Sequence, residues 1–216
     1  MTLKLYTFFR NSAGYRVRIA LNLKELAYDY VSVNIRDGRQ HDESFRVINP
    51  LGLIPALEHD GQIITQSAAI IEYLDELQPS PSLLPSDPVA RARSRAFAAA
   101  IAAESHALNN MRVHAFLDKA MALTPAERNT WYQHWAHEGL KALEAELARE
   151  GEHAFAYADH PTLADIFLVP QVVNYRNVNL DMSAYPRVNR VVAACETLPA
   201  FQKAAPEAQP DYIADK

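Results

Sequence analysis

Four prolines within ten residues divide this sequence into two parts. They interrupt the segment 78–88, at positions 79, 81, 85 and 88. Because proline lacks a backbone N–H and its ring clashes with the preceding turn of a helix, neither a continuous helix nor a continuous strand crosses such a segment. We therefore predict a linker here, which separates a domain over residues 1–80 from a domain over residues 89–216.

The first part alternates between strand-like and helix-like patterns. Apolar residues alternate over Leu3–Thr7, a helical segment runs to about Lys24, and the many β-forming residues of 27–35 predict a second strand. Asp60-Gly61 stands between two further strand-like runs, which is the strongest short-range signal of a β-hairpin. Ser67 is then expected to cap a helix. The order βαβ followed by ββα predicts an α/β domain.

The composition changes after the linker. Residues 89–150 are rich in Ala, Glu, Arg and Leu at helical spacing. Thr124-Pro125-Ala126-Glu127 predicts a helix start, because proline is favoured at the first helical position. Thr162-Leu163-Ala164-Asp165 precedes an apolar run and resembles a capping box with Asp in place of Glu. Together these patterns predict an all-helical second domain.

The overall composition is that of an ordinary globular protein. Of the 216 residues, 49% are hydrophobic and 22% charged, and no apolar run is long enough to span a bilayer, so we expect no membrane association. The net charge of −5 argues against a general nucleic-acid binder. Met1–Leu5 leads directly into a strand-like pattern without the shape of a signal peptide. Cys195 is the single cysteine, which fits a reducing cytoplasm and a core position.

A short polar turn, Arg10-Asn11-Ser12-Ala13-Gly14, separates the first strand from the first helix. Either Asn11 or Ser12 can cap that helix. Backbone N–H groups at a helix start are unpaired and the helix dipole is positive there, so this place favours an anion, including a thiolate. Several arginines in an acidic chain indicate a small anionic ligand, although a single arginine is more often a surface or ion-paired residue.

Several further motifs follow in order along the chain. Asn49-Pro50, Ile54-Pro55 and Gln66-Ser67 are similar to the glutathione-binding pattern of a thioredoxin-like domain, and Thr162–Asp165 is similar to the capping box of the helical domain in the same family. With the proline linker between them, these motifs resemble those of a cytosolic glutathione transferase over nearly the whole chain. The resemblance implies a thioredoxin-like α/β N-terminal domain and an all-α C-terminal domain.

Longer segments narrow the resemblance to one class. Those that look like the zeta class are Tyr15–Lys24, Gln66–Leu74, Leu168–Val172 and Gln209–Asp211, and Asn109–Arg112 is similar to a bacterial variant of that class. Members are cis–trans isomerases of maleylacetoacetate or maleylpyruvate with glutathione as cofactor, and some process small α-halo acids. The resemblance also implies a homodimer.

Two other functions stay open at this point. One is a general glutathione transferase that conjugates or dehalogenates small α-halo acids and consumes glutathione or displaces halide. The other is a non-catalytic glutathione-binding or stress protein, because a fold does not fix a function. The isomerase receives most weight, since the zeta-like segments run from end to end.

The resemblance assigns parts of glutathione to particular residues. Pro55 is expected to follow a cis peptide bond that turns the backbone of Ile54 toward the cysteinyl part. Taken alone, an isolated proline is more simply trans at a strand start. Gln66 and Ser67 are expected to hold the γ-glutamyl carboxylate at a helix N-terminus.

Two further glutathione contacts are less specific. Gln40 matches the family position at the glycyl end, with His41 as the alternative, and a solvated polar loop explains both residues equally well. His106 matches a histidine of bacterial relatives that reaches glutathione, and a helix-surface histidine is an equal alternative.

Ser12 is our candidate for activating the glutathione thiol. A free thiol has a pKa of about 8.5, and both a hydroxyl donor and a helix N-terminus favour the thiolate. The zeta class usually reads Ser-Ser-Cys here, whereas this chain reads Asn11-Ser12-Ala13. Asn11 is the alternative donor, because its amide also hydrogen-bonds. Helix capping alone would account for both residues.

Arg10, Arg112 and Arg176 are the candidate contacts for substrate carboxylates, and Arg10 is also a candidate catalytic residue together with Ser12 and Asn11. A planar guanidinium holds a carboxylate in a bidentate pair. Asn177 is the alternative to Arg176 at the matching family position, and Asn109 is a further candidate for substrate binding. No spacing of histidine, cysteine or carboxylate residues indicates a metal site.

Overall fold

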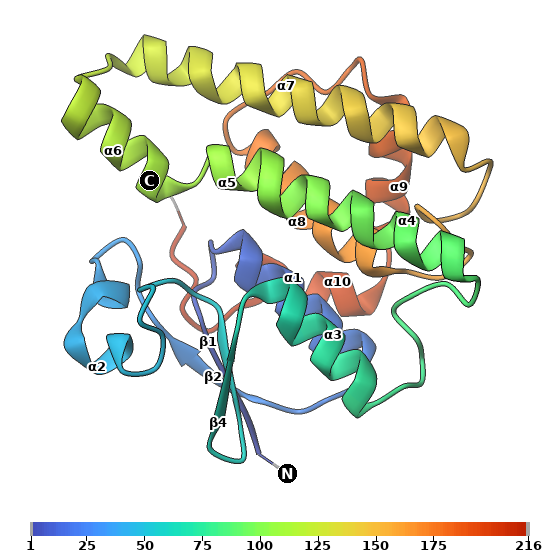
Figure 1. The fold of residues 1–216 in the computed structure, drawn as a ribbon, viewed down its shortest axis with the longest axis horizontal. Coiled ribbons are helices and arrows are strands. Elements are labelled where there is room, and N and C mark those ends of the chain that lie inside the picture. Colours follow the sequence, from blue (N-terminus) through green and yellow to red (C-terminus); the bar gives the residue numbers. More distant parts are fainter. Residues whose placement is uncertain (1, 215–216) are drawn as a thin grey trace. The chain divides into compact units, whose positions relative to one another are not determined.

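The computed structural model describes residues 2–214, which form two compact units. Unit 1 comprises the residues up to 83 together with the segment from 196 onward, and unit 2 comprises residues 84–195. In Figure 1, unit 1 is the part that contains the strands, and unit 2 is the part built of helices and loops.

A four-stranded mixed sheet forms the centre of unit 1. Its strands are β1 (Leu3–Thr7), β2 (Asp29–Ser32), β3 (Ala56–His59) and β4 (Gln62–Thr65), in the spatial order β2-β1-β3-β4. β2 runs parallel to β1, while β3 runs antiparallel to both β1 and β4. The predicted strands are confirmed, although β2, with four residues in register with β1, is shorter than the predicted range.

The β3–β4 hairpin shows why its sequence signal is strong. Asp60 and Gly61 both have positive φ, 46° and 82°. Such two-residue turns match the right-handed twist of the flanking strands, and glycine adopts positive φ without a steric cost. Asp60 is held further, since its Oδ1 accepts a hydrogen bond from the N–H of Thr2 at 3.2 Å.

Helices α1 (Ser12–Leu23) and α3 (Ser67–Leu77) follow β1 and β4 and pack against each other. The apolar face of α3, with Ile70, Ile71 and Leu74, is buried, as the helical spacing predicts. The shorter helical segments of unit 1 are η1 (Arg39–His41), α2 (Glu43–Arg46), α10 (Pro199–Ala204) and η3 (Pro206–Ala208).

The last part of the chain differs from the prediction. We expected residues 89–216 to form one helical domain, but the segment from residue 196 belongs to unit 1. Its helix α10 packs against α1, where Arg18 and Asn22 donate hydrogen bonds to α10 carbonyls at 3.0 and 2.9 Å. A helical pattern predicts a helix, but it does not show on which unit that helix packs.

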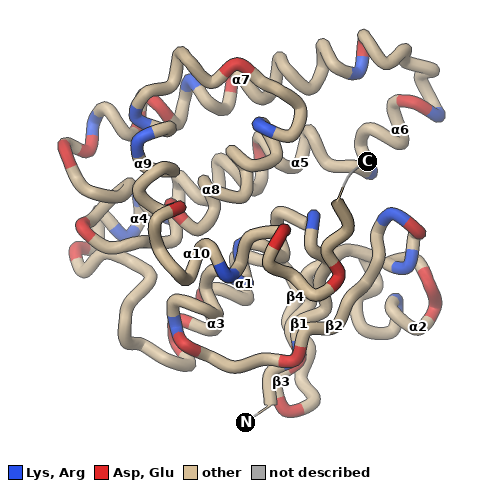
Figure 2. The backbone as a smooth tube through the Cα atoms, turned by 180° about the vertical axis from the view of Figure 1, so that it is seen from behind, with Lys and Arg blue, Asp and Glu red and all other residues tan. Residues whose placement is uncertain are grey.

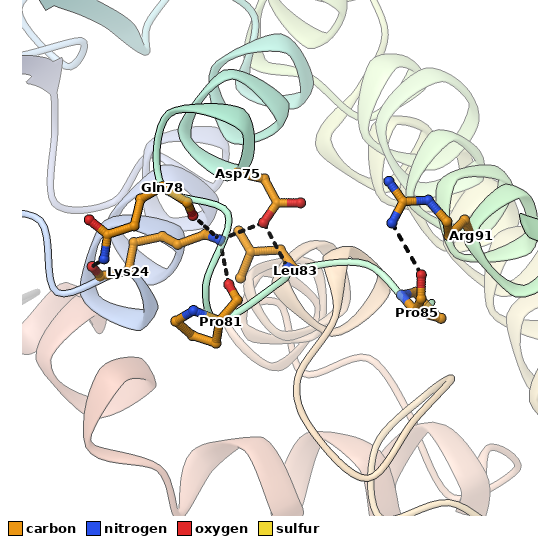
Figure 3. Close-up of polar contacts among 7 residues, drawn as sticks. All are labelled: Lys24, Asp75, Gln78, Pro81, Leu83, Pro85 and Arg91. Atoms are coloured by element: carbon orange, nitrogen blue, oxygen red, sulfur yellow. Dashed lines mark hydrogen bonds and ion pairs between the residues drawn. The ribbon is translucent and has the colours of Figure 1, made fainter. Parts of the chain in front are cut away.

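The proline-rich segment is irregular, and a buried lysine holds its first half (Figure 3). Lys24, next to the end of α1, is fully buried, and its Nζ donates to Asp75 Oδ1 at 2.5 Å. The same ammonium donates to the carbonyls of Gln78, at 2.7 Å, and Pro81. Asp75 Oδ1 also accepts from the N–H of Leu83 at 2.8 Å. Lys24 and Asp75 therefore supply hydrogen-bond partners for backbone groups of this segment that have none within a helix or a strand.

Unit 2 is helical, as predicted. Its elements are α4 (Pro88–Ala99), the π-helical segment η2 (Ala100–Ser105), α5 (His106–Leu108), α6 (Met111–Met121), α7 (Pro125–Arg149), α8 (Leu163–Arg176) and α9 (Pro186–Glu196), which ends at the boundary between the units. Acidic and basic residues are interspersed along α7 (Figure 2). Among residues 2–214, no helix is long and apolar enough to cross a membrane.

Capping boxes begin two helices of unit 2, one at the predicted helix start of Thr124 and one at the box predicted for Thr162–Asp165. At the start of α7, the carboxylate of Glu127 accepts from the N–H of Thr124 at 2.8 Å in an exposed box. At the start of α8, the fully buried Asp165 accepts from the N–H and the hydroxyl of Thr162, at 2.7 and 2.9 Å. Cys195 is buried beside it, with Sγ 3.8 Å from Asp165 Oδ1, which confirms the predicted core position.

Candidate functional site

The register of the sheet brings three predicted segments to one edge of unit 1. Tyr6 on β1 lies opposite Ala56 on β3, and Ala56 lies opposite Thr65 on β4. Because β3 runs antiparallel to both neighbours, its start lies beside the ends of β1 and β4. The polar turn, the predicted cis proline and the start of α3 therefore lie at the same edge of the sheet.

Asn11 caps α1. Its Oδ1 accepts a hydrogen bond from the N–H of Gly14 at 2.5 Å, and its backbone N–H donates to Phe8 O at 3.0 Å. Of the two caps that the sequence allows, the structure selects Asn11. Ser12 is buried in the first helical turn, and Arg10 is exposed beside it. With its oxygen committed to the cap, Asn11 has only its amide Nδ2 left as a donor.

Gly14 allows this turn to lie close to β1. A Cβ on Gly14 would stand 2.1 Å from Thr7 Oγ1 and 2.9 Å from the capping oxygen of Asn11. We expect Gly14→Ala to destabilise the protein by about 1–3 kcal/mol, because an added methyl group in a packed interior forces side chains out of place. Chemical denaturation measures the loss. In the double variant with Thr7→Ala the two effects should be less than additive, and strictly additive losses would contradict the clash.

The peptide bond between Ile54 and Pro55 is cis, as predicted. Both residues are buried. The side chain of Ile54 belongs to an apolar cluster with Phe8, Phe9, Val33 and Phe45, so the segment before β3 and the segment after β1 share one core. This packing fixes the backbone of Ile54 at the sheet edge.

Gln40 and His41 lie close to the loop that precedes the cis bond. A Cβ on Gly52 would stand 3.0 Å from Gln40 O and 3.1 Å from His41 Nδ1, and the φ of Gly52 is +61°, so glycine suits this place. His41 is exposed. In contrast, Gln40 Oε1 is buried and has no hydrogen-bond partner among residues 2–214. Gln40 therefore offers an acceptor that a bound donor can use.

The start of α3 corrects one prediction. The N-cap is Gln66, not Ser67, and Ser67 is the first helical residue. Gln66 has φ +70° and ψ 118°, a backbone conformation that residues other than glycine rarely adopt. Its side chain makes no capping hydrogen bond to α3. Strained, uncapped helix starts of this kind occur at ligand sites, where the free N–H groups bind an anion.

Sequence reasoning assigned no role to Arg16, which the structure places beneath the start of α3. The side chain is 1% exposed, and its Nη1 donates to Ser67 Oγ at 3.5 Å. A guanidinium here adds positive charge to the helix N-terminus. The available signal was an arginine within the otherwise apolar face of α1.

In unit 2, three predicted residues lie around the junction of α5 and α6. His106 Nε2 is 3.5 Å from Asn110 Nδ2, and Asn110 caps α6 by accepting from the N–H of Arg112 at 3.1 Å. Asn109 Nδ2 donates to Tyr132 O on α7 at 3.1 Å. The side chain of Arg112 is exposed. Asn109 therefore fixes the junction, while the guanidinium stays accessible.

Aromatic rings connect this junction with the end of α8. The ring centroid of Tyr132 lies 6.3 Å from that of Tyr175 and 5.8 Å from that of His114. Burial raises the pKa of Tyr132, and burial also lowers the pKa of His114, so both side chains are neutral near neutral pH. Arg176 follows the buried Tyr175 and is exposed at the end of α8, which Asn177 caps. Tyr132 thus contacts both Asn109, through its carbonyl oxygen, and the ring of Tyr175, the residue before Arg176.

The two parts of the chain match two domains of one protein family. Residues 1–76 match Glutathione S-transferase, N-terminal domain, and residues 126–194 match Glutathione S-transferase, C-terminal domain. The chain is 42% identical over 210 residues to a maleylpyruvate isomerase from a Ralstonia species, which covers 97% of this chain and 99% of that protein. The chain belongs to the glutathione S-transferase family.

Solved structures place this glutathione S-transferase near the zeta class. A holo structure of maleylpyruvate isomerase, described as a bacterial glutathione S-transferase in the zeta class, matches with a TM-score of 0.94 and 42% identity, over 97% of this chain and 100% of that one. Maleylacetoacetate isomerase from Anaeromyxobacter dehalogenans, with bound dicarboxyethyl glutathione and citrate, matches with a TM-score of 0.87 and 38% identity, over 99% and 98%. The resemblance and the two-part fold predicted from the sequence are confirmed.

Proposed function

We propose that this chain is a glutathione-dependent cis–trans isomerase of maleylacetoacetate, maleylpyruvate or a closely similar acid. The observation that carries the proposal is the edge of the unit 1 sheet. There the cis Ile54–Pro55 bond, the uncapped start of α3 and the start of α1 lie together. Relatives that match over nearly the whole chain are named for these two isomerase activities.

The residues at this edge fit glutathione part by part. The backbone of Ile54 is fixed by its apolar cluster and suits the cysteinyl peptide group. The free N–H groups at the start of α3 suit the γ-glutamyl carboxylate, with the charge of Arg16 beneath them. The buried Oε1 of Gln40 suits an N–H donor at the glycyl end. His106 lies in unit 2, and we retain it as a proposed contact.

Groups at the start of α1 activate the glutathione thiol in this proposal. Bound glutathione supplies a thiolate that adds to the cis double bond and leaves again, so the bond rotates while it is single and glutathione is regenerated. Ser12 donates a hydrogen bond that favours the thiolate, and the N–H groups and dipole of α1 act in the same direction. The cap made by Asn11 keeps this helix start in place.

Three arginines supply the contacts for a substrate with carboxylate groups. Arg10, Arg112 and Arg176 are all exposed residues. Each can hold a carboxylate in a bidentate pair. Asn109 supports the same region of unit 2 through its hydrogen bond to α7. The ligand of the Anaeromyxobacter relative, dicarboxyethyl glutathione, likewise combines glutathione with carboxylate groups.

A substrate comparison tests the proposed reaction. We expect purified protein with glutathione to convert maleylpyruvate or maleylacetoacetate to the trans isomer, followed by ultraviolet absorbance and by NMR of the vinyl protons. Turnover of a small α-halo acid with halide release should be much slower. Rapid halide release without isomerisation would favour the general transferase, and glutathione binding without turnover would favour a binding protein.

We also propose a cytoplasmic homodimer. The family resemblance supports the dimer, with the α/β unit of one subunit against the helical unit of the other. The single cysteine is reduced and buried, which fits a reducing compartment. Light scattering coupled to gel filtration tests the assembly, and a mass near 24.2 kDa would mean a monomer.

A further inference from the structure

A second arginine of α1 lies directly beneath the polar turn. Arg18 has no exposed surface. Its Nη1 donates to Phe8 O at 3.3 Å and its Nη2 donates to Phe9 O at 3.0 Å. These two carbonyls belong to the residues that immediately precede Arg10 and the cap. The guanidinium therefore lies against the backbone of the turn, at the N-terminal end of its own helix.

The remaining hydrogen bonds of Arg18 join the turn to two other elements. Nη1 donates to Thr7 Oγ1 on β1 at 3.2 Å, and Nε donates to Ala204 O at the end of α10 at 3.0 Å. The carbonyls at the end of a helix lack partners within the helix and carry partial negative charge, so a guanidinium is favoured there. One side chain thus holds the turn, the strand before it and the C-terminal helix together.

Among the residues that the structure describes, the Arg18 guanidinium donates to neutral oxygens and not to a carboxylate. All four hydrogen-bond acceptors are neutral oxygens, and no ion pair of Arg18 occurs within residues 2–214. The groups that act on it from neighbouring elements are the phenols of Tyr15, Tyr28 and Tyr30 and the carboxylate of Asp211. Asp211 is engaged by the hydroxyls of Tyr30, at 2.7 Å, and Ser32. Burial lowers the pKa of Arg18, but a guanidinium stays protonated in proteins.

We propose that Arg18 is a positioning residue for the thiolate site: it fixes the turn that carries Asn11 and Ser12, and its buried charge favours an anion at the start of α1. The proposal rests on the proposed glutathione chemistry and deepens it. A buried cation whose hydrogen-bond acceptors within residues 2–214 are all neutral, and which lies close to the N–H groups of a helix start, gains energy when a thiolate binds there. The role differs from that of Arg16, which lies under the start of α3.

Lys24 provides a matched control on the same segment of chain. Like Arg18, it is a fully buried cation that donates several hydrogen bonds. Those bonds go to Asp75 and to the proline-rich segment, and none goes to the polar turn (Figure 3). Lys24→Met should therefore cost stability without changing the thiol, whereas Arg18→Met should change the thiol as well.

The test is the pKa of the glutathione thiol in the complex. It is read from ultraviolet thiolate absorbance against pH, with the spectrum of each protein without glutathione subtracted, so that Cys195 does not contribute. We expect Arg18→Met to raise this pKa by about one unit, which is typical for the loss of a nearby opposite charge. Lys24→Met should leave it at the wild-type value. Both should bind glutathione with a Kd within about threefold of wild type.

Two milder variants keep the test decisive if Arg18→Met fails to fold. Arg18→Lys retains the positive charge but loses the planar set of N–H donors of the guanidinium. Thr7→Val replaces one hydrogen-bond acceptor of Arg18 by a methyl group of similar volume. Each should lower kcat several-fold and leave KM for glutathione nearly unchanged. If the folded Arg18 variants keep the wild-type thiol pKa and kcat, the positioning role is overturned. A shift of the thiol pKa in Lys24→Met equal to that in Arg18→Met would overturn it as well. If the thiol bound to wild-type protein titrates like free glutathione, the proposed function itself fails.

Discussion

Ser12→Ala is expected to lower kcat about 100-fold, the size of effect seen when one hydrogen-bond donor to a developing or buried anion is removed. Ser12 is buried in the first turn of α1, where the helix start and the hydroxyl both favour a thiolate. In the proposed site the Ser12 hydroxyl contacts the sulfur, while Ile54 and the start of α3 hold the peptide of glutathione. KM for glutathione should therefore change much less than kcat. Steady-state kinetics with either cis acid measures both constants.

Asn11→Ser is the matched control for Ser12→Ala. Serine caps helices as well as asparagine does, so this variant keeps the start of α1 while it removes the amide. We expect activity close to that of wild type. If Ser12→Ala is fully active and Asn11→Ser is 100-fold slower, the activating donor is Asn11 instead.

Asp165→Ala is expected to have the largest effect on stability, a loss of about 3–5 kcal/mol in the free energy of unfolding. Removal of this fully buried carboxylate leaves its hydrogen-bond donors without an acceptor. The N–H of Ala156 donates to Oδ1 at 2.9 Å, and the N–H and hydroxyl of Thr162 donate to Oδ2. Both donor residues, Ala156 and Thr162, are buried, so solvent does not readily replace the lost acceptor. Such a loss is a large part of the stability of an ordinary domain. Denaturant unfolding followed by circular dichroism measures it, if the variant remains folded.

The exposed capping box of α7 supplies the comparison. Glu127 accepts from the N–H of Thr124 in the same arrangement, but water reaches the groups that its removal would free. Glu127→Ala should therefore destabilise the protein far less than Asp165→Ala. Equal losses in the two variants would show that burial of the Asp165 carboxylate is not the cause.

Local patterns in the sequence predict much of this fold because each rests on backbone geometry. Asp60-Gly61 predicts the hairpin since both residues tolerate positive φ, and both have it. The four prolines predict an irregular segment because they cannot donate to a helix or a sheet. Thr162 and Asp165 predict a helix start because the box satisfies N–H groups that are free at any helix start.

Features that depend on distant contacts were not predictable in the same way. Nothing local to α10 shows that its last carbonyl accepts from Arg18, which stands 186 residues earlier. The N-cap of α3 was placed one residue late, because Ser67 is the better capping residue and the strained backbone of Gln66 leaves no trace in the sequence. The buried positions of Arg16, Arg18 and Lys24 likewise depend on what packs around α1.

In the candidate site, too, some features were predictable from the sequence and others were not. Pro55 was assigned a cis bond by its resemblance to a family motif, and the bond is cis. The roles of Ser12, Gln40 and the three arginines stay predictions, since they concern contacts with ligands. The choice between Asn11 and Ser12 as cap could not be made from residue type, because both are good caps. It is made by the 2.5 Å hydrogen bond to Gly14.

The most direct test of glutathione as a regenerated cofactor is its stoichiometry. Protein, maleylpyruvate in large excess and a small fraction of an equivalent of glutathione are followed by proton NMR until conversion stops, and free thiol is then titrated. We expect complete conversion to the trans isomer, with the starting glutathione recovered as free thiol. Conversion that stops after one product molecule per glutathione, with loss of the thiol, would contradict the isomerase account.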